Sequence, residues 1–186
     1  MPRLIPLLTV LALVAPPALA AEDVSEQLEQ CPACHGAEGV PDDPAIPIIW
    51  GQEYYYLYVQ LRDYQAGRRA NEIMGAIVAD LSRDQMKALA EHFAEKSWPE
   101  IGFAADSAAV SAGQSGLAAG QCSQCHSTFT GDSRVPRLAG QQPGYLEQTM
   151  LDFKNRVRMN APDKGSLMRS FDDDVLRNMA HYLAGL

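Results

Sequence analysis

The sequence Cys31-Pro-Ala-Cys34-His35 recurs later in the chain as Cys122-Ser-Gln-Cys125-His126. These two stretches contain all 4 cysteines of the 186-residue chain and begin 91 residues apart. A Cys-x-x-Cys pair followed at once by His is typical of c-type haem attachment, because each thiol can form a thioether with a haem vinyl group while the histidine binds the iron. The sequence therefore predicts two covalent haems, with Cys31, Cys34, Cys122 and Cys125 as attachment sites and His35 and His126 as iron ligands.

Two other uses of paired cysteines fit the spacing less well. A zinc site built from two Cys-x-x-Cys pairs brings them within roughly 15–20 residues of each other, whereas 87 residues separate Cys34 from Cys122. A redox-active disulfide in each stretch would explain neither the histidine that follows nor the repetition. Haem attachment accounts for both.

The repetition extends beyond the cysteine motifs. Pro47-Ile-Ile-Trp-Gly51-Gln52 returns 89 residues later as Pro136-Arg-Leu-Ala-Gly140-Gln141. Five further residues recur at the same offset, namely Tyr56, Leu57, Asp63, Arg69 and Asn71 with Tyr145, Leu146, Asp152, Arg158 and Asn160. A duplicated domain explains these matches, and short insertions in loops explain the small drift in offset.

Each copy is predicted to be helical. Apolar residues at helical spacing predict a helix over residues 53–65, and Ser82-Arg-Asp-Gln85 is a capping box that opens a last helix. The acidic run that starts at Asp172 suits the N-terminus of the corresponding helix in the second copy. We therefore predict an all-α fold of two tandem haem-binding domains, residues 21–97 and 114–186, joined by a Pro-, Gly-, Ala- and Ser-rich linker over residues 98–113.

Residues 1–20 are predicted to be a cleaved secretory signal peptide. A weakly basic start precedes an apolar run over residues 4–15, and Ala18-Leu-Ala20 provides a cleavage site. A membrane anchor is the alternative, but about 20 apolar residues are needed to span a bilayer, and this run is shorter and is broken by Pro6, Pro16 and Pro17. We therefore expect export to the periplasm, with cleavage after Ala20.

The sixth iron ligand is predicted to be a methionine in each copy. Met74 lies 39 residues after His35, just before the last helix of the first copy. In the second copy Met168 lies 42 residues after His126 and Met159 lies 33 after it, so the interval favours Met168 but leaves Met159 open. Two filled axial positions leave no place for oxygen, peroxide or substrate, which suits electron transfer rather than catalysis.

Two prolines and two histidines outside the motifs complete the candidate set. The backbone carbonyl of Pro47 or Pro136 could accept a hydrogen bond from the axial imidazole and so raise its donor strength. A simple turn before the next helix explains these prolines equally well. His92 and His181 lie in the predicted last helices without a cysteine partner, and we interpret them as ordinary surface or core residues.

Charge is divided unevenly between the copies. The chain has a formal net charge of −8, which argues against electrostatic binding to nucleic acid or anionic membranes. Residues 22–97 carry 6 basic and 14 acidic side chains, whereas residues 114–186 carry 8 basic and 7 acidic ones. This asymmetry predicts that the two haem edges face different partners, although an ordinary solvated surface would also account for it.

A second difference between the copies is an apolar face on the predicted 53–65 helix. Tyr55, Tyr58 and Val59 share this face, whereas the second copy has Gly144, Glu147 and Gln148 at these positions. The core that the copies have in common therefore does not need the three residues. Aromatic side chains are frequent anchors of interfaces, so we predict that this face packs against the other domain or a partner protein.

These motifs resemble those of the tandem di-haem class I cytochromes c, over essentially the whole chain after residue 20. The Gly-Gln helix starts are similar to those of cytochrome c4. The stretch from Glu72 to Ser82, followed by a helix and Trp98-Pro99, is similar to the cytochrome subunit of flavocytochrome c sulfide dehydrogenase. The resemblance implies a class I cytochrome c fold for each domain. It also implies one ligand pair per haem, His35 with Met74 and His126 with Met168, and proline carbonyls that support the histidines.

The resemblance further implies an electron-transfer protein rather than an enzyme. We favour a periplasmic subunit that accepts electrons from a flavoprotein sulfide dehydrogenase, and the alternative is a free cytochrome c4-like shuttle to a terminal oxidase. A haem peroxidase or sensor with one five-coordinate iron is disfavoured by the two available methionines. We expect no nucleic-acid partner and no membrane span.

Overall fold

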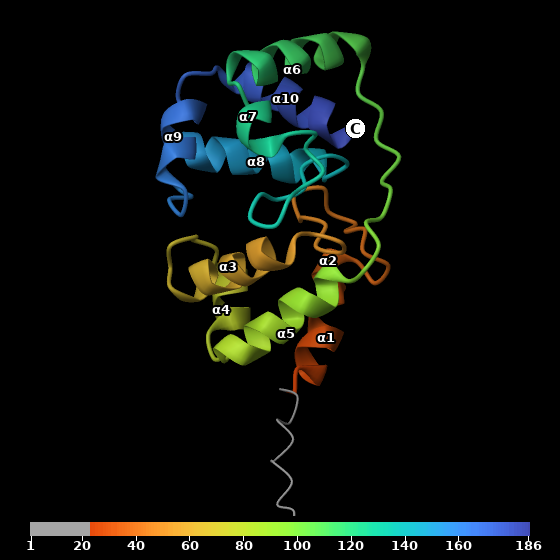
Figure 1. Cartoon of the computed structure of the whole chain (residues 1–186), viewed down its shortest axis with the longest axis vertical. Helices are drawn as coiled ribbons and strands as arrows, with labels where there is room; N and C mark the ends of the chain where they lie inside the picture. Colours follow the sequence, from red (N-terminus) through yellow and green to blue (C-terminus); the bar gives the residue numbers. More distant parts are fainter. Residues whose placement is uncertain (1–22) are drawn as a thin grey trace, which may run out of the picture.

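The computed structural model describes residues 23–186, so the predicted signal peptide over residues 1–20 lies outside the described residues. Within that range the chain forms ten helices and no strand beyond isolated bridges, as the all-α prediction requires. Figure 1 shows two lobes stacked along the long axis, one built from α1–α5 and the other from α6–α10. The helices are α1 (Ser25–Gln30), α2 (Pro32–His35), α3 (Tyr54–Gln65), α4 (Glu72–Val78), α5 (Arg83–Ala94), α6 (Ser107–Ala119), α7 (Ser123–His126), α8 (Pro143–Lys154), α9 (Pro162–Met168) and α10 (Asp173–Ala184).

Both lobes share one helical plan. In the N-terminal lobe α3 packs against α4 and α5, and in the C-terminal lobe α8 packs against α9 and α10. The N-terminal core is formed by Val78, Leu81, Met86, Leu89 and Phe93. The C-terminal core includes Leu146, Met150, Phe153, Leu176, Met179 and Leu183. Domains this small bury little apolar area of their own, so a bound prosthetic group would complete each core.

Two helix starts show how the local sequence sets the fold. The Ser82 hydroxyl accepts from the Gln85 N–H at 3.0 Å, and the Gln85 side chain accepts from the Ser82 N–H at 2.9 Å. This is the predicted capping box, and α5 begins directly after it. Asp172 is the N-cap of α10, whose first turn is acidic. Both predicted starts are confirmed.

The linker is shorter than the sequence predicts. Only residues 98–106 run as an extended connection along one side of the molecule (Figure 1), because α6 begins at Ser107, inside the predicted 98–113 segment. The Asp106 carboxylate caps α6 by accepting from the Ala109 N–H at 2.8 Å. Alanine is the strongest helix former, so a stretch rich in Ala and Ser can be helical although its composition resembles a linker.

Two glycines allow α6 to lie very close to α10. A Cβ atom at Gly113 would collide with the Asn178 carbonyl oxygen and would lie 2.6 Å from the Cβ of Tyr182. A Cβ atom at Gly116 would lie 2.8 Å from the Met179 side chain. The small residues that suggested a linker are therefore the ones that fit α6 onto the last helix.

Replacing Gly113 by Ala should lower the free energy of unfolding by about 1–3 kcal/mol, because the new methyl group forces α6 away from α10. Gly75→Ala is the matched control, since an added Cβ at this glycine in α4 meets no atom within 4 Å. That control should be neutral or stabilising by up to about 1 kcal/mol. Urea unfolding followed by circular dichroism compares the two variants, and equal effects would contradict the role given to the α6–α10 contact.

Candidate haem sites

Each cysteine motif forms one turn of helix that places its three key side chains on one side. The His35 N–H donates to the Cys31 carbonyl at 3.0 Å, and the His126 N–H donates to the Cys122 carbonyl at the same distance. Residues three and four apart are neighbours on a helix surface, so the first cysteine lies beside both the second cysteine and the histidine. All four thiols are free. The two pairs lie in different lobes and so do not share one zinc ion.

The His35 imidazole is held in one tautomer. Its Nδ1 atom lies 2.8 Å from the Pro47 carbonyl oxygen. Because a carbonyl only accepts, Nδ1 carries the hydrogen and Nε2 keeps its lone pair. Burial lowers the pKa of His35, which the Pro47 carbonyl opposes, and the residue is 9% exposed. A neutral imidazole with a free Nε2 is the form that binds a haem iron.

His126 is in a similar environment but lacks the hydrogen bond that His35 makes. Burial lowers the pKa of His126 to about 4, the charge of Lys164 adds to this effect, and the Pro136 carbonyl opposes it. Among the residues that the structure describes, the buried Nδ1 atom nevertheless has no partner at hydrogen-bonding geometry. The Pro136 carbonyl therefore lies near His126 without being bonded to it. The ring also stacks on Phe129, with the centroids 6.5 Å apart.

The candidate methionines differ in burial. Met74 lies in α4, where its N–H donates to the N-cap Asn71 at 2.8 Å and its side chain packs against the N-terminal core. Met168 ends α9 and is 8% exposed within the C-terminal core. Met159 is 62% exposed. A thioether that excludes water from an iron has to be buried, so this difference favours Met168 over Met159.

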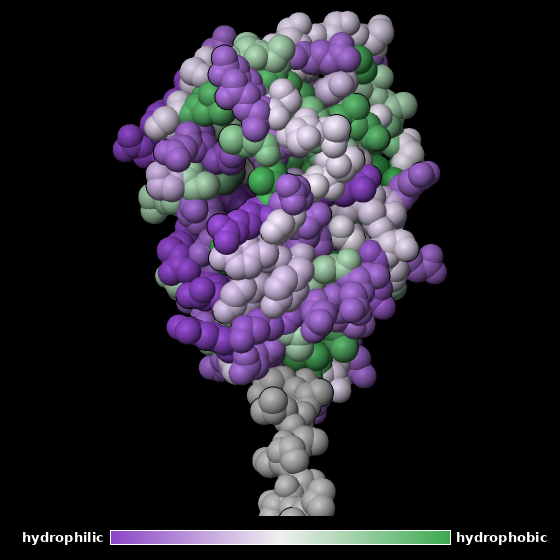
Figure 2. Space-filling model, viewed as in Figure 1, coloured by the Kyte–Doolittle hydropathy of each residue, from purple (hydrophilic) through white to green (hydrophobic). Residues whose placement is uncertain are grey.

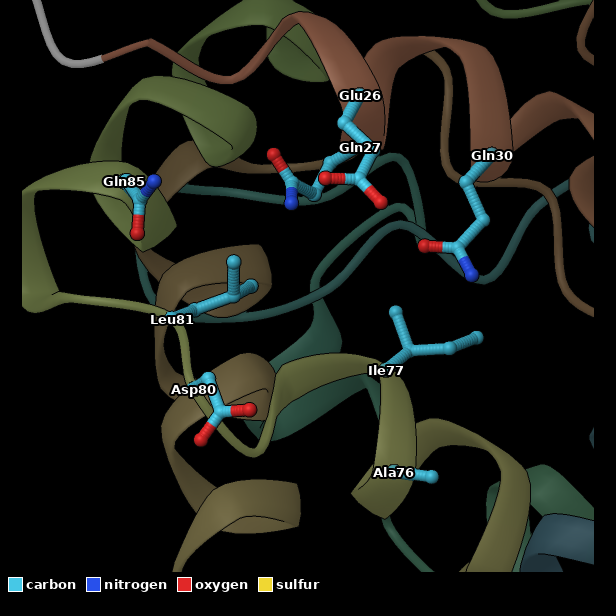
Figure 3. A pocket seen from close by; sticks show the side chains of 8 residues that line it. All are labelled: Glu26, Gln27, Gln30, Ala76, Ile77, Asp80, Leu81 and Gln85. Atoms are coloured by element: carbon cyan, nitrogen blue, oxygen red, sulfur yellow. The ribbon is translucent and has the colours of Figure 1, made fainter.

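Cavities lie beside both cysteine motifs. A cavity of about 320 Å³ opens between α1 and α4, and Figure 3 shows the side chains that line it. Gln30, directly before Cys31, is on one wall, and Ala76 and Ile77 from the Met74 helix are on the facing wall. In the C-terminal lobe a cavity of about 180 Å³ reaches Ser123, inside the second motif.

Polar side chains at repeated positions join the two lobes. The Arg69 guanidinium donates to the Tyr145 hydroxyl at 3.0 Å, and the Arg158 guanidinium donates to the Tyr56 hydroxyl at 3.3 Å. The two arginines are 89 residues apart in the chain, and so are the two tyrosines. An approximate two-fold axis therefore relates the two contacts. The backbones of Arg69 and Arg158 also meet in an isolated antiparallel bridge.

A buried cluster fills the centre of this interface. The Gln60 side-chain oxygen accepts from Arg69 at 3.0 Å, from Arg158 at 2.8 Å and from Asn160 at 3.1 Å. Asn160 also donates to the Asp63 carboxylate at 2.7 Å. Three of these four contacts cross from one lobe to the other, so a single polar cluster fixes the lobes relative to each other.

The cluster has a surplus of positive charge. Arg69 and Arg158 are 8% and 7% exposed, and within residues 23–186 neither forms a salt bridge. Burial raises the pKa of Tyr56 and would also raise that of Tyr145, but the two arginine charges lower the pKa of Tyr145 to about 7. The Arg69 charge also lowers the pKa of His35. An anionic group beside the first histidine would therefore be stabilised.

One residue of the tyrosine face of α3 contacts the other lobe. The Arg134 guanidinium of the C-terminal lobe lies 5.4 Å from the centroid of the Tyr55 ring, which confirms the predicted contact with the other domain for this residue. Tyr58 is partly buried and packs against the core of its own lobe. Contact of Tyr58 and Val59 with a partner protein stays a prediction. Figure 2 shows that hydrophilic residues cover much of the N-terminal lobe, in keeping with its acidic sequence.

In the sequence, most of these interface residues stand out only because they recur at equivalent positions in the two copies. Tyr56 and Arg69 each recur as the same polar residue in the second copy. A polar residue that recurs at the same place in both copies indicates a shared buried role, and this signal could have identified the interface. Gln60 gave no such signal, because its counterpart in the second copy is Thr149.

Comparison with known proteins places the chain in a family. It is 32% identical over 170 residues to cytochrome c4 from Thiocapsa roseopersicina, across 84% of this chain and 86% of that one. The chain belongs to the cytochrome c4 family. The solved structure of cytochrome c4 from Acidithiobacillus ferrooxidans matches it with a TM-score of 0.76 and 27% identity, across 85% of this chain and 99% of that one. No protein-family model matches the chain.

Two other relatives carry more specific names. The thiosulfate dehydrogenase electron acceptor of Stutzerimonas stutzeri is 29% identical, across 84% of this chain and 78% of that one. The cytochrome subunit of sulfide dehydrogenase from Chlorobaculum tepidum is 30% identical over 67 residues, across 36% of this chain and 60% of that one. The likeness to cytochrome c4 thus spans both lobes, and the likeness to the sulfide dehydrogenase subunit is partial.

Membership of the cytochrome c4 family confirms the main predictions. The protein is a di-haem electron carrier with two c-type haems, and it is not an enzyme. Its partners are redox proteins. Over residues 23–186 no helix has both the length and the apolar character needed to cross a membrane.

Asn160→Ala should weaken the contact between the lobes by about 1–3 kcal/mol, because two acceptors on the N-terminal lobe lose a donor. We expect urea unfolding, followed by haem absorbance and tryptophan fluorescence, to separate into two steps. Asn71→Ala is the matched control at the equivalent position, where the side chain caps α4. Loss of this cap should cost about 1 kcal/mol without separating the lobes. One cooperative transition in Asn160→Ala would contradict the prediction.

Proposed function

We propose that each motif holds one haem through its two thiols and that each iron has one histidine and one methionine ligand. The residues are Cys31, Cys34, His35 and Met74 for the N-terminal haem, and Cys122, Cys125, His126 and Met168 for the C-terminal haem. The observation that carries this proposal is the His35–Pro47 hydrogen bond at 2.8 Å, which leaves Nε2 free beside two free thiols. The burial of Met168 supports the second methionine.

The residues around each site suit an electron carrier. A haem with histidine and methionine ligands supplies an iron that changes charge while its coordination hardly changes. The Pro47 carbonyl orients the His35 imidazole and raises its donor strength. The C-terminal core buries Met168, whereas Met74 is partly buried against the N-terminal core. Arg69 and Arg158 offer buried positive charge to the carboxylates of the haem propionates.

We infer that each lobe is one haem domain and that residues 98–106 connect them. The N-terminal domain then extends over residues 21–97, and the C-terminal domain begins with α6 at Ser107 rather than at residue 114. We also infer that residues 1–20 direct export to the periplasm, on the strength of the apolar run and the Ala18-Leu-Ala20 cleavage site.

We propose a free carrier that takes electrons from a dehydrogenase of a reduced sulfur compound and passes them to another redox protein, such as a terminal oxidase. The relative named as a thiosulfate dehydrogenase electron acceptor supports this choice, because it matches both lobes.

The second candidate is the cytochrome subunit of a flavoprotein sulfide dehydrogenase. The partial match to such a subunit and the stretch from Glu72 to Ser82 favour it. Purification from native periplasm separates the two candidates. A di-haem protein that elutes alone supports the free carrier, and co-elution with a flavin-binding protein supports the subunit.

Met168→Leu should remove the far-red Met–Fe(III) absorption of one haem and convert its iron to a high-spin form, because leucine has no lone pair for the iron. The other haem should keep its band. Met159→Leu is the matched control and should keep both bands. Optical and electron paramagnetic resonance spectra of the ferric proteins give the answer. Loss of a band in Met159→Leu alone would reassign the ligand.

A further inference from the structure

Two glutamines cross the interface and hold the backbone of the opposite lobe. The Gln141 Oε1 atom accepts from the Ile48 N–H at 2.8 Å, and its Nε2 donates to the Ile48 carbonyl at 3.0 Å. Gln52 makes the same two contacts with the backbone of Arg137, at 2.7 and 3.0 Å. Both glutamines are buried, at 2% and 3% exposure. The approximate two-fold axis of the interface relates the contacts of Gln52 to those of Gln141.

Each glutamine is also fixed within its own lobe. The preceding residues, Gly51 and Gly140, have φ angles of +64° and +70°, a left-handed conformation that favours glycine. The Gln141 Oε1 atom additionally accepts from the Gln142 N–H at 2.9 Å, at the start of α8. Gln52 does the same for Glu53 at 3.0 Å, at the start of α3. The side chains are therefore held in place before they reach across.

The peptide bond between Pro47 and Ile48 joins this contact to the axial histidine. Its carbonyl oxygen accepts from His35 Nδ1, and its N–H donates to Gln141. Hydrogen bonds in a chain polarise one another, so the bond to Gln141 makes the Pro47 carbonyl a stronger acceptor. A stronger acceptor at Nδ1 raises the basicity of Nε2.

We propose that Gln141 is a positioning residue for the haem of the opposite lobe. It adjusts the reduction potential of the N-terminal haem through the Pro47–Ile48 peptide. This inference rests on the proposed ligation by His35. Within residues 23–186 Nδ1 of His126 has no hydrogen-bond partner, so Gln52 lacks a corresponding route to the C-terminal haem and serves as an internal comparison.

The test is a redox titration of the mature di-haem protein, with paramagnetically shifted NMR signals that report each haem separately. Gln141→Leu removes the acceptor for the Ile48 N–H, which makes the Pro47 carbonyl a weaker acceptor. His35 would then donate less electron density to the iron, so the ferrous state should be stabilised relative to the ferric state. At a fixed ambient potential the ferrous-to-ferric ratio of the N-terminal haem should rise about two- to tenfold, where tenfold corresponds to 59 mV for one electron. The C-terminal haem should not shift.

Gln142→Leu is the matched control. Gln142 is also buried and also donates across the interface, to the Pro41 carbonyl at 3.0 Å. That carbonyl is not bonded to a histidine, so the variant should leave the N-terminal ratio unchanged. Gln141→Glu keeps an oxygen acceptor for Ile48 and should not shift this haem toward the ferrous state. If Gln141→Leu does not fold, Gln141→Glu still tests the proposal, because a shift of the N-terminal haem toward the ferrous state in that variant would contradict it. Gln52→Leu, whose partner peptide is not bonded to a histidine, should leave the ratios of both haems unchanged.

Three results would overturn the inference. The first is an unchanged ferrous-to-ferric ratio of the N-terminal haem in Gln141→Leu while both far-red bands are intact. The second is a change in Gln141→Leu that is confined to the C-terminal haem, and the third is an equal change of the N-terminal ratio in Gln142→Leu. Failure of the proposed ligation is distinguishable, because the unaltered protein would then lack one or both Met–Fe(III) bands.

Discussion

The hydrogen bond from His35 Nδ1 to the Pro47 carbonyl constrains three parts of the molecule at once. It fixes the tautomer that a haem iron needs, and it ties the cysteine motif to the loop that leads into α3. The same loop carries Gly51 and Gln52, which start the helix and reach the other lobe. Haem ligation, helix placement and contact between the lobes therefore share one short segment. A change in any of the three would be felt by the other two.

Local signals explain why so much of the fold could be predicted from the sequence. The cysteine motifs and the capping box at Ser82 act over one turn of helix, so residues close in the chain suffice to identify them. The linker could not be placed so well, because the close packing of α6 at Gly113 is against α10, some 65 residues later in the chain. Composition alone does not distinguish an Ala- and Ser-rich helix from a connection when the deciding contact is tertiary.

The residues of the candidate site likewise differ in how far neighbouring residues in the chain suffice to identify them. The histidines and cysteines follow from adjacent residues, whereas Met168 and Met159 differ in burial, which the spacing from His126 does not reveal. The interface was harder still, because Gln60 has no polar amide counterpart in the second copy and takes its role only when the lobes meet. Its neighbours Arg69 and Arg158 recur at equivalent positions, but the repeat does not reveal that each meets a tyrosine of the opposite lobe.

Duplication gives this interface its form. Two copies of one domain that meet about an approximate two-fold axis make each contact twice, so Arg69 with Tyr145 is matched by Arg158 with Tyr56. Buried polar contacts contribute little net stability, but they are costly to misplace, because a displaced lobe would leave buried charges without partners. A mostly apolar interface would tolerate sliding far better. The polar one holds the two lobes, and with them the two cysteine motifs, in one relative placement.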